Sequence, residues 1–156
     1  AIMMSLCCDV LTALQGKTLV TAESLTGGGI GAALTAVPGS SAVYKGGIIS
    51  YTNWVKENIL GVSHETLETH GAVSLQTAEE MAVGVRKLLG ADVAVSVTGL
   101  AGPGGDDYGN PVGTVCIGYS NQCESFAVRH RFEGNRQDVR NQTIQAALEL
   151  VLDNNQ

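Results

Sequence analysis

Apolar residues recur at helical spacing in several parts of the chain. The first such stretch predicts a helix over residues 2–15 that ends at Gly16. A second helix is expected to begin at Ser74 and to stop at Gly90. Its apolar stripe consists of Ala78, Met81, Ala82, Val85, Leu88 and Leu89. Such stripes predict helices that cover a core on one side.

The last helix is expected over residues 136–152. Asn135 suits its N-cap, and Asp138 follows three positions later, a spacing typical of a capping box. The positions expected to face inward are Val139, Thr143, Ala146, Ala147, Leu150 and Val151. Shorter helices are predicted from Ser24 to about Val37 and from a cap at Asn53 to Leu60.

Short apolar or alternating runs lie between these helices and predict strands. They cover residues 18–23, 46–51, 92–97, 112–120 and 123–132, and the last two read as a hairpin around residues 121–122. Strands that alternate with helices predict an α/β fold, a three-layer α/β/α arrangement with a mixed sheet. Without a linker or an internal repeat, residues 1–156 are expected to form a single domain.

Composition and charge narrow the class of partner. The net charge is −6, which argues against nucleic acid, because such binding depends on neutralising phosphates. No apolar run has the roughly 20 residues that a membrane-spanning helix needs, so no membrane partner is expected. The four cysteines form no C-x-x-C pair, and with no evident secretory signal we expect reduced thiols and a cytoplasmic location.

The segment TAESLTGGG, residues 21–29, carries the first candidate chemistry. Glycine destabilises a helix by about 1 kcal/mol relative to alanine, so a helix that opens on Gly27 and Gly28 suggests exposed backbone N–H groups that hold an anion. Ser24 would lie beside these N–H groups, whose partial positive charge would favour its alkoxide, and would act as a nucleophile. The alternative is that Ser24 is only an N-cap and that the glycines permit close helix packing.

A second segment, residues 46–56, places Tyr51 at a strand end and Lys56 in the first turn of the following helix. A cation there meets an unfavourable helix dipole. The position suits a lysine that must spend time as a neutral amine, as a general base for a serine must. A surface lysine without a function is the alternative.

The third segment, residues 97–105, is a glycine-rich loop after a buried strand, the usual ligand position in α/β sheets. Thr98 offers a hydroxyl there, and backbone from Gly99 to Gly105 offers N–H groups. Asp106 and Asp107 follow, and we interpret them as solvated carboxylates rather than metal ligands.

In the fourth segment, Arg136 and Arg140 share a face at the start of the last helix, again the unfavourable end for cations. Arginine binds phosphate and carboxylate in a bidentate manner. The alternative is an exposed helix in which these arginines pair with Glu133 or Asp138. The three histidines have no partner at ligand spacing, and no metal site is predicted.

Together these segments resemble a known family. The matching motifs, in order and spacing, are TAES-x-TGG, GG-x-x-SYTN-x-x-K before LGV, HGAVS, VTG-x-AGPGG, PVGTV and F-x-G-x-R-x-x-VR. They resemble the CinA carboxy-terminal domain family from about residue 5 to residue 152. One departure is Leu25, where the family commonly has cysteine; we expect altered packing there rather than lost activity.

The resemblance implies a metal-independent serine amidohydrolase without a cofactor that hydrolyses nicotinamide mononucleotide to nicotinate mononucleotide and ammonia. Ser24 would be the nucleophile, Lys56 and Tyr51 would move its proton, and Thr98 would assist. Substrate would be bound by Gly27, Gly28, Gly99, Gly102, Arg136 and Arg140. The alternative function is a non-catalytic nucleotide-binding or regulatory module. The expected partner is a small nucleotide, with a homo-oligomer as a further option.

Overall fold

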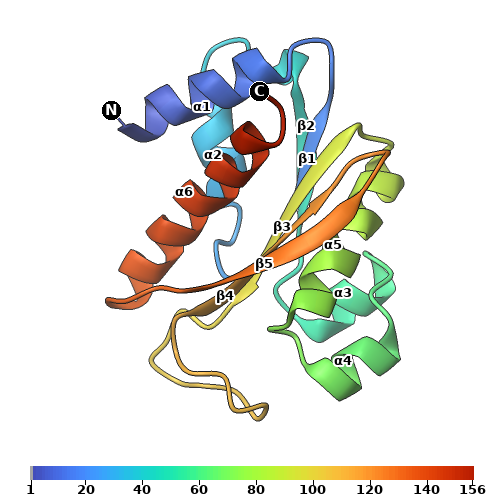
Figure 1. Ribbon diagram of the computed structural model, residues 1–156, viewed down its shortest axis with the longest axis vertical. Coiled ribbons are helices and arrows are strands. Elements are labelled where there is room, and N and C mark those ends of the chain that lie inside the picture. The colour runs from blue at the N-terminus through green and yellow to red at the C-terminus, as the bar shows by residue number, and fades with distance from the viewer. Residues whose placement is uncertain (1) are drawn as a thin grey trace.

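One mixed sheet of five strands forms the centre of the molecule (Figure 1). The structure is a computed structural model and describes residues 2–156. The strand order is β2-β1-β3-β4-β5. Strands β1 (Leu19–Glu23), β2 (Tyr44–Ile49) and β3 (Val93–Gly99) run parallel, whereas β4 (Thr114–Ser120) and β5 (Ser125–Arg131) form the antiparallel hairpin. The predicted mixed sheet and hairpin are confirmed.

Helices cover both faces of this sheet. On one face α1 (Ile2–Ala13), α2 (Gly29–Thr35) and α6 (Arg136–Asp153) pack against one another. On the other face α5 (Leu75–Leu89) packs on β1, β3 and β4, with α3 (Asn53–Asn58) and α4 (His64–His70) in the same layer (Figure 1). A single 3-10 turn, Ser40–Ala42, precedes β2. The three-layer prediction is confirmed.

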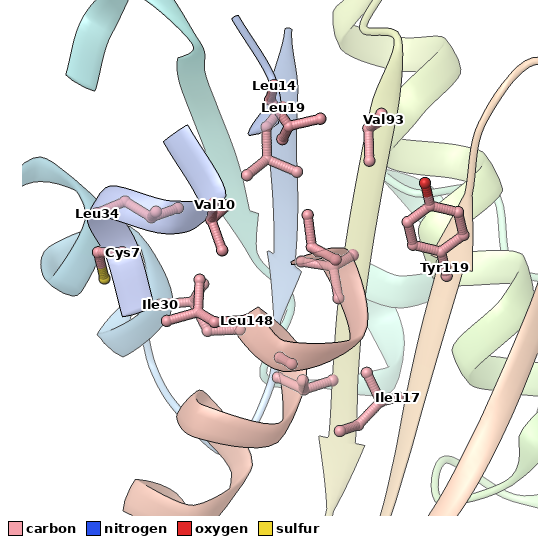
Figure 2. Packing of buried hydrophobic residues seen from close by; sticks show 14 of the residues in the cluster. Cys7, Val10, Leu14, Leu19, Ile30, Leu34, Val93, Ile117, Tyr119 and Leu148 are labelled. Atoms are coloured by element: carbon pink, nitrogen blue, oxygen red, sulfur yellow. The ribbon is translucent and has the colours of Figure 1, made fainter. Parts of the chain in front are cut away.

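Each face of the sheet has its own core. The larger one lies under α1, α2 and α6 and includes Leu19, Leu34, Val93 and Leu148 (Figure 2). The α5 face carries smaller side chains and lets the helix approach closely. A Cβ added at Gly118 would lie 2.1 Å from the carbonyl oxygen of Ala78 on α5. Glycine in β4 is therefore required by backbone contact with α5.

Several predicted boundaries are wrong. The helix expected from Ser24 begins only at Gly29, after a glycine turn. Thr52, not Asn53, caps α3, because its hydroxyl accepts from the backbone N–H of Val55. Leu88 and Leu89 are 52% and 42% exposed; Leu88 borders an open groove beside the end of α3 instead of the core.

Other predicted features of the helices are confirmed. Ser74 caps α5, and Gly90 ends that helix in the left-handed conformation. Asn135 and Asp138 form the predicted capping box of α6. Helix α4 was not predicted, because its seven residues, HETLETH, contain one apolar side chain and so give no helical stripe.

Candidate active site

The carboxyl ends of β1, β2 and β3 open into one pocket of about 570 Å³. Parallel strands bring their following loops to the same edge of the sheet, and this edge is the usual ligand position in α/β proteins. The pocket is lined by Ser24, Leu25, Tyr51, Asn53, Lys56, Ala72, Val73, Thr98, Gly99, Leu100, Ala101, Gly102, Gly104, Gly105, Asp106, Asp107, Tyr108 and Arg136. The structure thus brings together residues from all four segments singled out in the sequence.

Ser24 is the first residue after β1 and is 6% exposed. Its backbone N–H donates to the carbonyl oxygen of Val97 on β3, which continues the parallel pairing by one residue. The chain then turns through Gly27 and Gly28, whose φ angles of 59° and 102° favour glycine. This tight turn presents the Ser24 hydroxyl at the pocket wall.

The N-terminus of α2 is already occupied by an anion of the protein itself. The buried carboxylate of Glu23 accepts from the backbone N–H groups of Ile30 and Gly31 and from the Thr26 hydroxyl. The N–H groups of Ile30 and Gly31 are therefore not free to hold a substrate anion. A carboxylate from the preceding strand compensates the helix dipole instead.

The glycines of this segment serve two purposes. Gly27 and Gly28 form the turn, whereas Gly29 and Gly31 allow close packing. A Cβ at Gly29 would lie 2.7 Å from Ile144 Cδ1, and one at Gly31 would lie 2.8 Å from the Tyr44 hydroxyl. The packing alternative holds for these two glycines, but Ser24 is not the N-cap, which is Gly28.

Lys56 is buried, 1% exposed, and reaches Ser24 from α3. Its Nζ donates to Ser24 Oγ at 3.1 Å and to the carbonyl oxygen of Ser50 at 2.8 Å. Among residues 2–156 no carboxylate forms a salt bridge with it. Burial lowers the pKa of the Lys56 ammonium from 10.5 to about 8.

The physical reason for this shift differs from the one expected. Helix α3 has only six residues, and Lys56 lies in its last turn, where a helix dipole favours a cation. Desolvation, not the dipole, is what disfavours the charged lysine.

Tyr51 and Arg136 meet at the mouth of the pocket. Tyr51 is 59% exposed, and its hydroxyl accepts from Arg136 Nη2 at 3.2 Å. Arg136 Nη1 donates to the carbonyl oxygen of Gly102 at 2.7 Å. Arg136 thus joins the loop after β2 to the loop after β3 and leaves part of its guanidinium facing the pocket.

Thr98 lies at the end of β3, and its hydroxyl donates to the carbonyl oxygen of Ala72 at 2.8 Å. Gly99 is needed for packing, since an added Cβ would lie 2.7 Å from Val115 Cγ2.

Asp106 accepts from Asn110 and from the backbone N–H of Tyr108. Desolvation opposes ionisation of Asp106, but these hydrogen bonds outweigh it and lower the pKa of the carboxyl. Asp106 therefore shapes the loop after β3.

Not every predicted binding residue reaches the pocket. Arg140 donates to the carbonyl oxygens of Leu25 and Thr26, so its guanidinium fixes the Ser24 turn from behind. Gly27 and Gly28 lie in that turn and do not line the cavity. Arg129 and Arg131 on β5 are exposed and do not line the pocket.

One residue that supports the site, Glu23, was not predicted, although the sequence contained a signal for it. Glu23 ends a strand, LVTAE, whose residues are all buried. A carboxylate at the end of a largely apolar strand needs a specific partner, and this requirement pointed to Glu23. Asn53, Ala72, Val73 and Tyr108 also line the pocket; their residue types gave no comparable signal.

Residues 2–156 contain no group of three or more His, Cys, Asp or Glu side chains placed to hold a metal ion. None of the described helices is long and apolar enough to cross a membrane.

Known proteins resemble this chain along nearly its whole length. A CinA-like protein of Parasynechococcus marenigrum is 50% identical over 151 residues, which are 94% of this chain and 36% of that protein. A putative competence-damage inducible protein of Clostridium tetani is 46% identical over 153 residues, covering 94% and 37%. The chain thus spans about a third of the length of these curated relatives.

Solved structures share the fold. The competence/damage inducible protein CihA of Agrobacterium tumefaciens has a TM-score of 0.95 and 41% identity and is matched over 100% of this chain and 97% of that chain. A CinA superfamily protein of Klebsiella pneumoniae has a TM-score of 0.93 and 37% identity, with 97% and 96% covered. The family model for the CinA C-terminal domain matches residues 3–154, and the chain belongs to this family.

Proposed function

We propose that the chain is a nicotinamide-nucleotide amidase that hydrolyses the carboxamide of nicotinamide mononucleotide with Ser24 as nucleophile. The observation that carries the proposal is the contact of the buried Lys56 Nζ with Ser24 Oγ at 3.1 Å. A serine hydroxyl needs an adjacent base to become a nucleophile. With a pKa of about 8, roughly one Lys56 in ten is neutral at pH 7, against about one in three thousand at a pKa of 10.5.

The reaction proceeds in two displacements. Ser24 Oγ attacks the carboxamide carbon while neutral Lys56 takes the hydroxyl proton. The resulting ammonium gives a proton to the nitrogen, the C–N bond breaks, and ammonia leaves an ester on Ser24. Water then attacks the ester carbon, Lys56 takes a proton from that water, and the nicotinate nucleotide departs as Ser24 Oγ regains its proton.

The developing oxyanion needs donors near Ser24. The N–H of Leu25 follows the nucleophile directly and donates to no protein acceptor in the described chain. Gly102, Gly104 and Gly105 line the same cavity. The Leu25 side chain packs in the core, so leucine in place of cysteine is compatible with activity.

Arg136 is the proposed phosphate ligand. It is the cation at the pocket mouth, and the N-terminus of α2 is not available because Glu23 occupies it. The Tyr51 hydroxyl is bound to Arg136 rather than to Ser24, so we assign Tyr51 to substrate orientation and leave proton transfer to Lys56. Thr98 supports the pocket wall through its hydrogen bond to the carbonyl oxygen of Ala72.

Ammonia release from nicotinamide mononucleotide by the purified protein tests this function. Free nicotinamide serves as a control, because it carries the same carboxamide without the phosphate. The proposal predicts turnover of the mononucleotide at a rate far above that of nicotinamide. Saturable binding of the mononucleotide without ammonia release would instead support a nucleotide-binding module.

A further inference from the structure

We propose that Glu23 is a positioning residue for the nucleophile: its carboxylate holds the turn that presents Ser24 to Lys56. This inference rests on the proposed function, because it assigns Glu23 a part in the reactivity of Ser24. It starts from a buried carboxylate for which the reaction steps have no use.

The Glu23 carboxylate links the strand before the Ser24 turn to the helix that follows the turn. Glu23 immediately precedes Ser24, yet its Oε1 accepts from the Ile30 N–H at 2.8 Å and its Oε2 accepts from the Gly31 N–H at 3.0 Å. Oε1 also accepts from the Thr26 hydroxyl inside the turn. Both carboxylate oxygens therefore bind groups that lie beyond Ser24 in the chain.

This turn needs such a restraint. Gly27 and Gly28 have wide conformational freedom, and their backbone angles are outside the helical range. Within the turn the hydrogen bonds are Gly27 N–H to Ser24 O at 3.1 Å and Gly29 N–H to Thr26 O at 3.0 Å. The charge-assisted hydrogen bonds that the carboxylate accepts are stronger than these neutral ones, and they fix the start of α2 against the end of β1.

The main chain of Glu23 also connects to the base. Its carbonyl oxygen accepts from the Ser50 N–H at 2.8 Å, and the carbonyl oxygen of Ser50 in turn accepts from Lys56 Nζ at 2.8 Å. One residue thus ties the nucleophile turn on one side to the anchor of Lys56 on the other. The Ser24–Lys56 distance is set by bonds that meet at Glu23.

The carboxylate is 2% exposed and forms no salt bridge in the described chain. A buried ion is costly unless its hydrogen bonds are satisfied, and here three donors and the α2 dipole satisfy it. A neutral amide at this position would place an NH₂ group against the N–H of Ile30 or Gly31. Glu23→Gln therefore loosens the turn while preserving side-chain size.

The test compares Glu23→Gln with the wild type in two assays. One measures kcat and KM for ammonia release; the other measures the rate at which a fluorophosphonate phosphonylates Ser24 and releases fluoride. Misplacement of a reacting group by about 1 Å costs roughly a hundredfold. We expect kcat and the labelling rate to fall together by about ten- to a hundredfold, with KM within about twofold of the wild type.

A matched control removes a comparable carboxylate at the other end of the same strands. Asp92 accepts from the backbone N–H and the hydroxyl of Thr18, at 2.9 and 3.2 Å, where β1 and β3 begin. Asp92→Asn is expected to reduce stability without changing Ser24 labelling. If Glu23→Gln does not fold, Thr26→Val, which removes one partner of the carboxylate, is expected to lower kcat and labelling without raising KM.

Normal labelling in a folded Glu23→Gln protein would overturn the positioning role, as would normal labelling in Thr26→Val if the first variant is unfolded. Wild-type Ser24 that labels but releases no ammonia from the mononucleotide would refute the proposed function alone, since the labelling ratio still tests Glu23. Wild-type Ser24 that does not label would overturn both.

Discussion

Lys56 Nζ lies 3.1 Å from Ser24 Oγ, although the two residues are 32 positions apart in the chain. Ser24 follows β1 and Lys56 lies on α3, so the contact depends on the pairing of β1 with β2. The lysine is buried and has no carboxylate partner among residues 2–156, which distinguishes it from an ordinary surface lysine. The environment of Lys56 therefore suits a general base better than a member of a structural ion pair.

The pH dependence of kcat/KM is expected to follow Lys56. In the proposed mechanism the neutral amine is the reactive form, and its pKa is lowered to about 8, so kcat/KM should rise with pH and level off above about 8. Initial rates at low substrate concentration between pH 6 and 10 measure this rising part of the pH profile, the limb. Lys56→Met should abolish turnover over the whole range.

Lys45 provides the matched control for this profile. It is a lysine on β2 whose Nζ binds the carbonyl oxygen of Ser41 near the surface. Lys45→Met should leave both the rate and the position of the limb unchanged. A limb that stays at the same pH in an active Lys56 variant would assign it to another group.

The same lysine makes stability depend on pH. Its pKa is about 8 in the folded protein and 10.5 when exposed, so between these values the unfolded chain binds more protons. Stability then rises as pH increases through this window, by up to about 3 kcal/mol. Chemical denaturation at pH 7.5 and 10 should show this gain relative to Lys56→Met, and parallel pH profiles for the two proteins would argue against it.

Arg136→Ala is expected to weaken substrate binding more than turnover. The arginine lies at the pocket mouth, and a charge-assisted contact contributes about 1.5–3 kcal/mol, so kcat/KM should fall roughly ten- to a hundredfold, mainly through KM. Steady-state kinetics with nicotinamide mononucleotide measure the effect. Arg131→Ala removes an exposed arginine outside the pocket and should have little effect.

Nicotinamide riboside separates phosphate binding from loop support. It lacks the phosphate, so it should be a poor substrate that the Arg136 substitution hardly changes. Equal losses for both substrates would show that Arg136 acts through its contacts with Tyr51 and Gly102 rather than on the phosphate.

The sequence predicted the sheet, its hairpin and the major helices because their apolar patterns are strong. Boundaries near the site were less predictable. A run of glycines beside Ser24 fits both a helix start and a turn, and only the positive φ angles of Gly27 and Gly28 distinguish them. Likewise Thr52 and Asn53 are both good caps, and the path of the chain after β2 decides between them.

Among the candidate site residues, those at strand ends were predictable in position, because parallel strands bring their ends together. Arginine orientation was not. Arg136 and Arg140 share a helix face, yet one reaches the pocket and the other binds the backbone of Leu25 and Thr26. Side-chain spacing predicts a shared face, but the carbonyl groups exposed by the Ser24 turn decide which partner each arginine finds.

The proposed role of Ser24 as the nucleophile of an amidase is tested by the substitution Ser24→Ala. Ammonia release from nicotinamide mononucleotide is measured for the wild type and the variant, with thermal unfolding and mononucleotide binding measured on the same samples. We predict robust release by the wild type, none above background for Ser24→Ala, and a folded variant that still binds the mononucleotide. Turnover by Ser24→Ala at the wild-type rate would exclude Ser24 as the nucleophile.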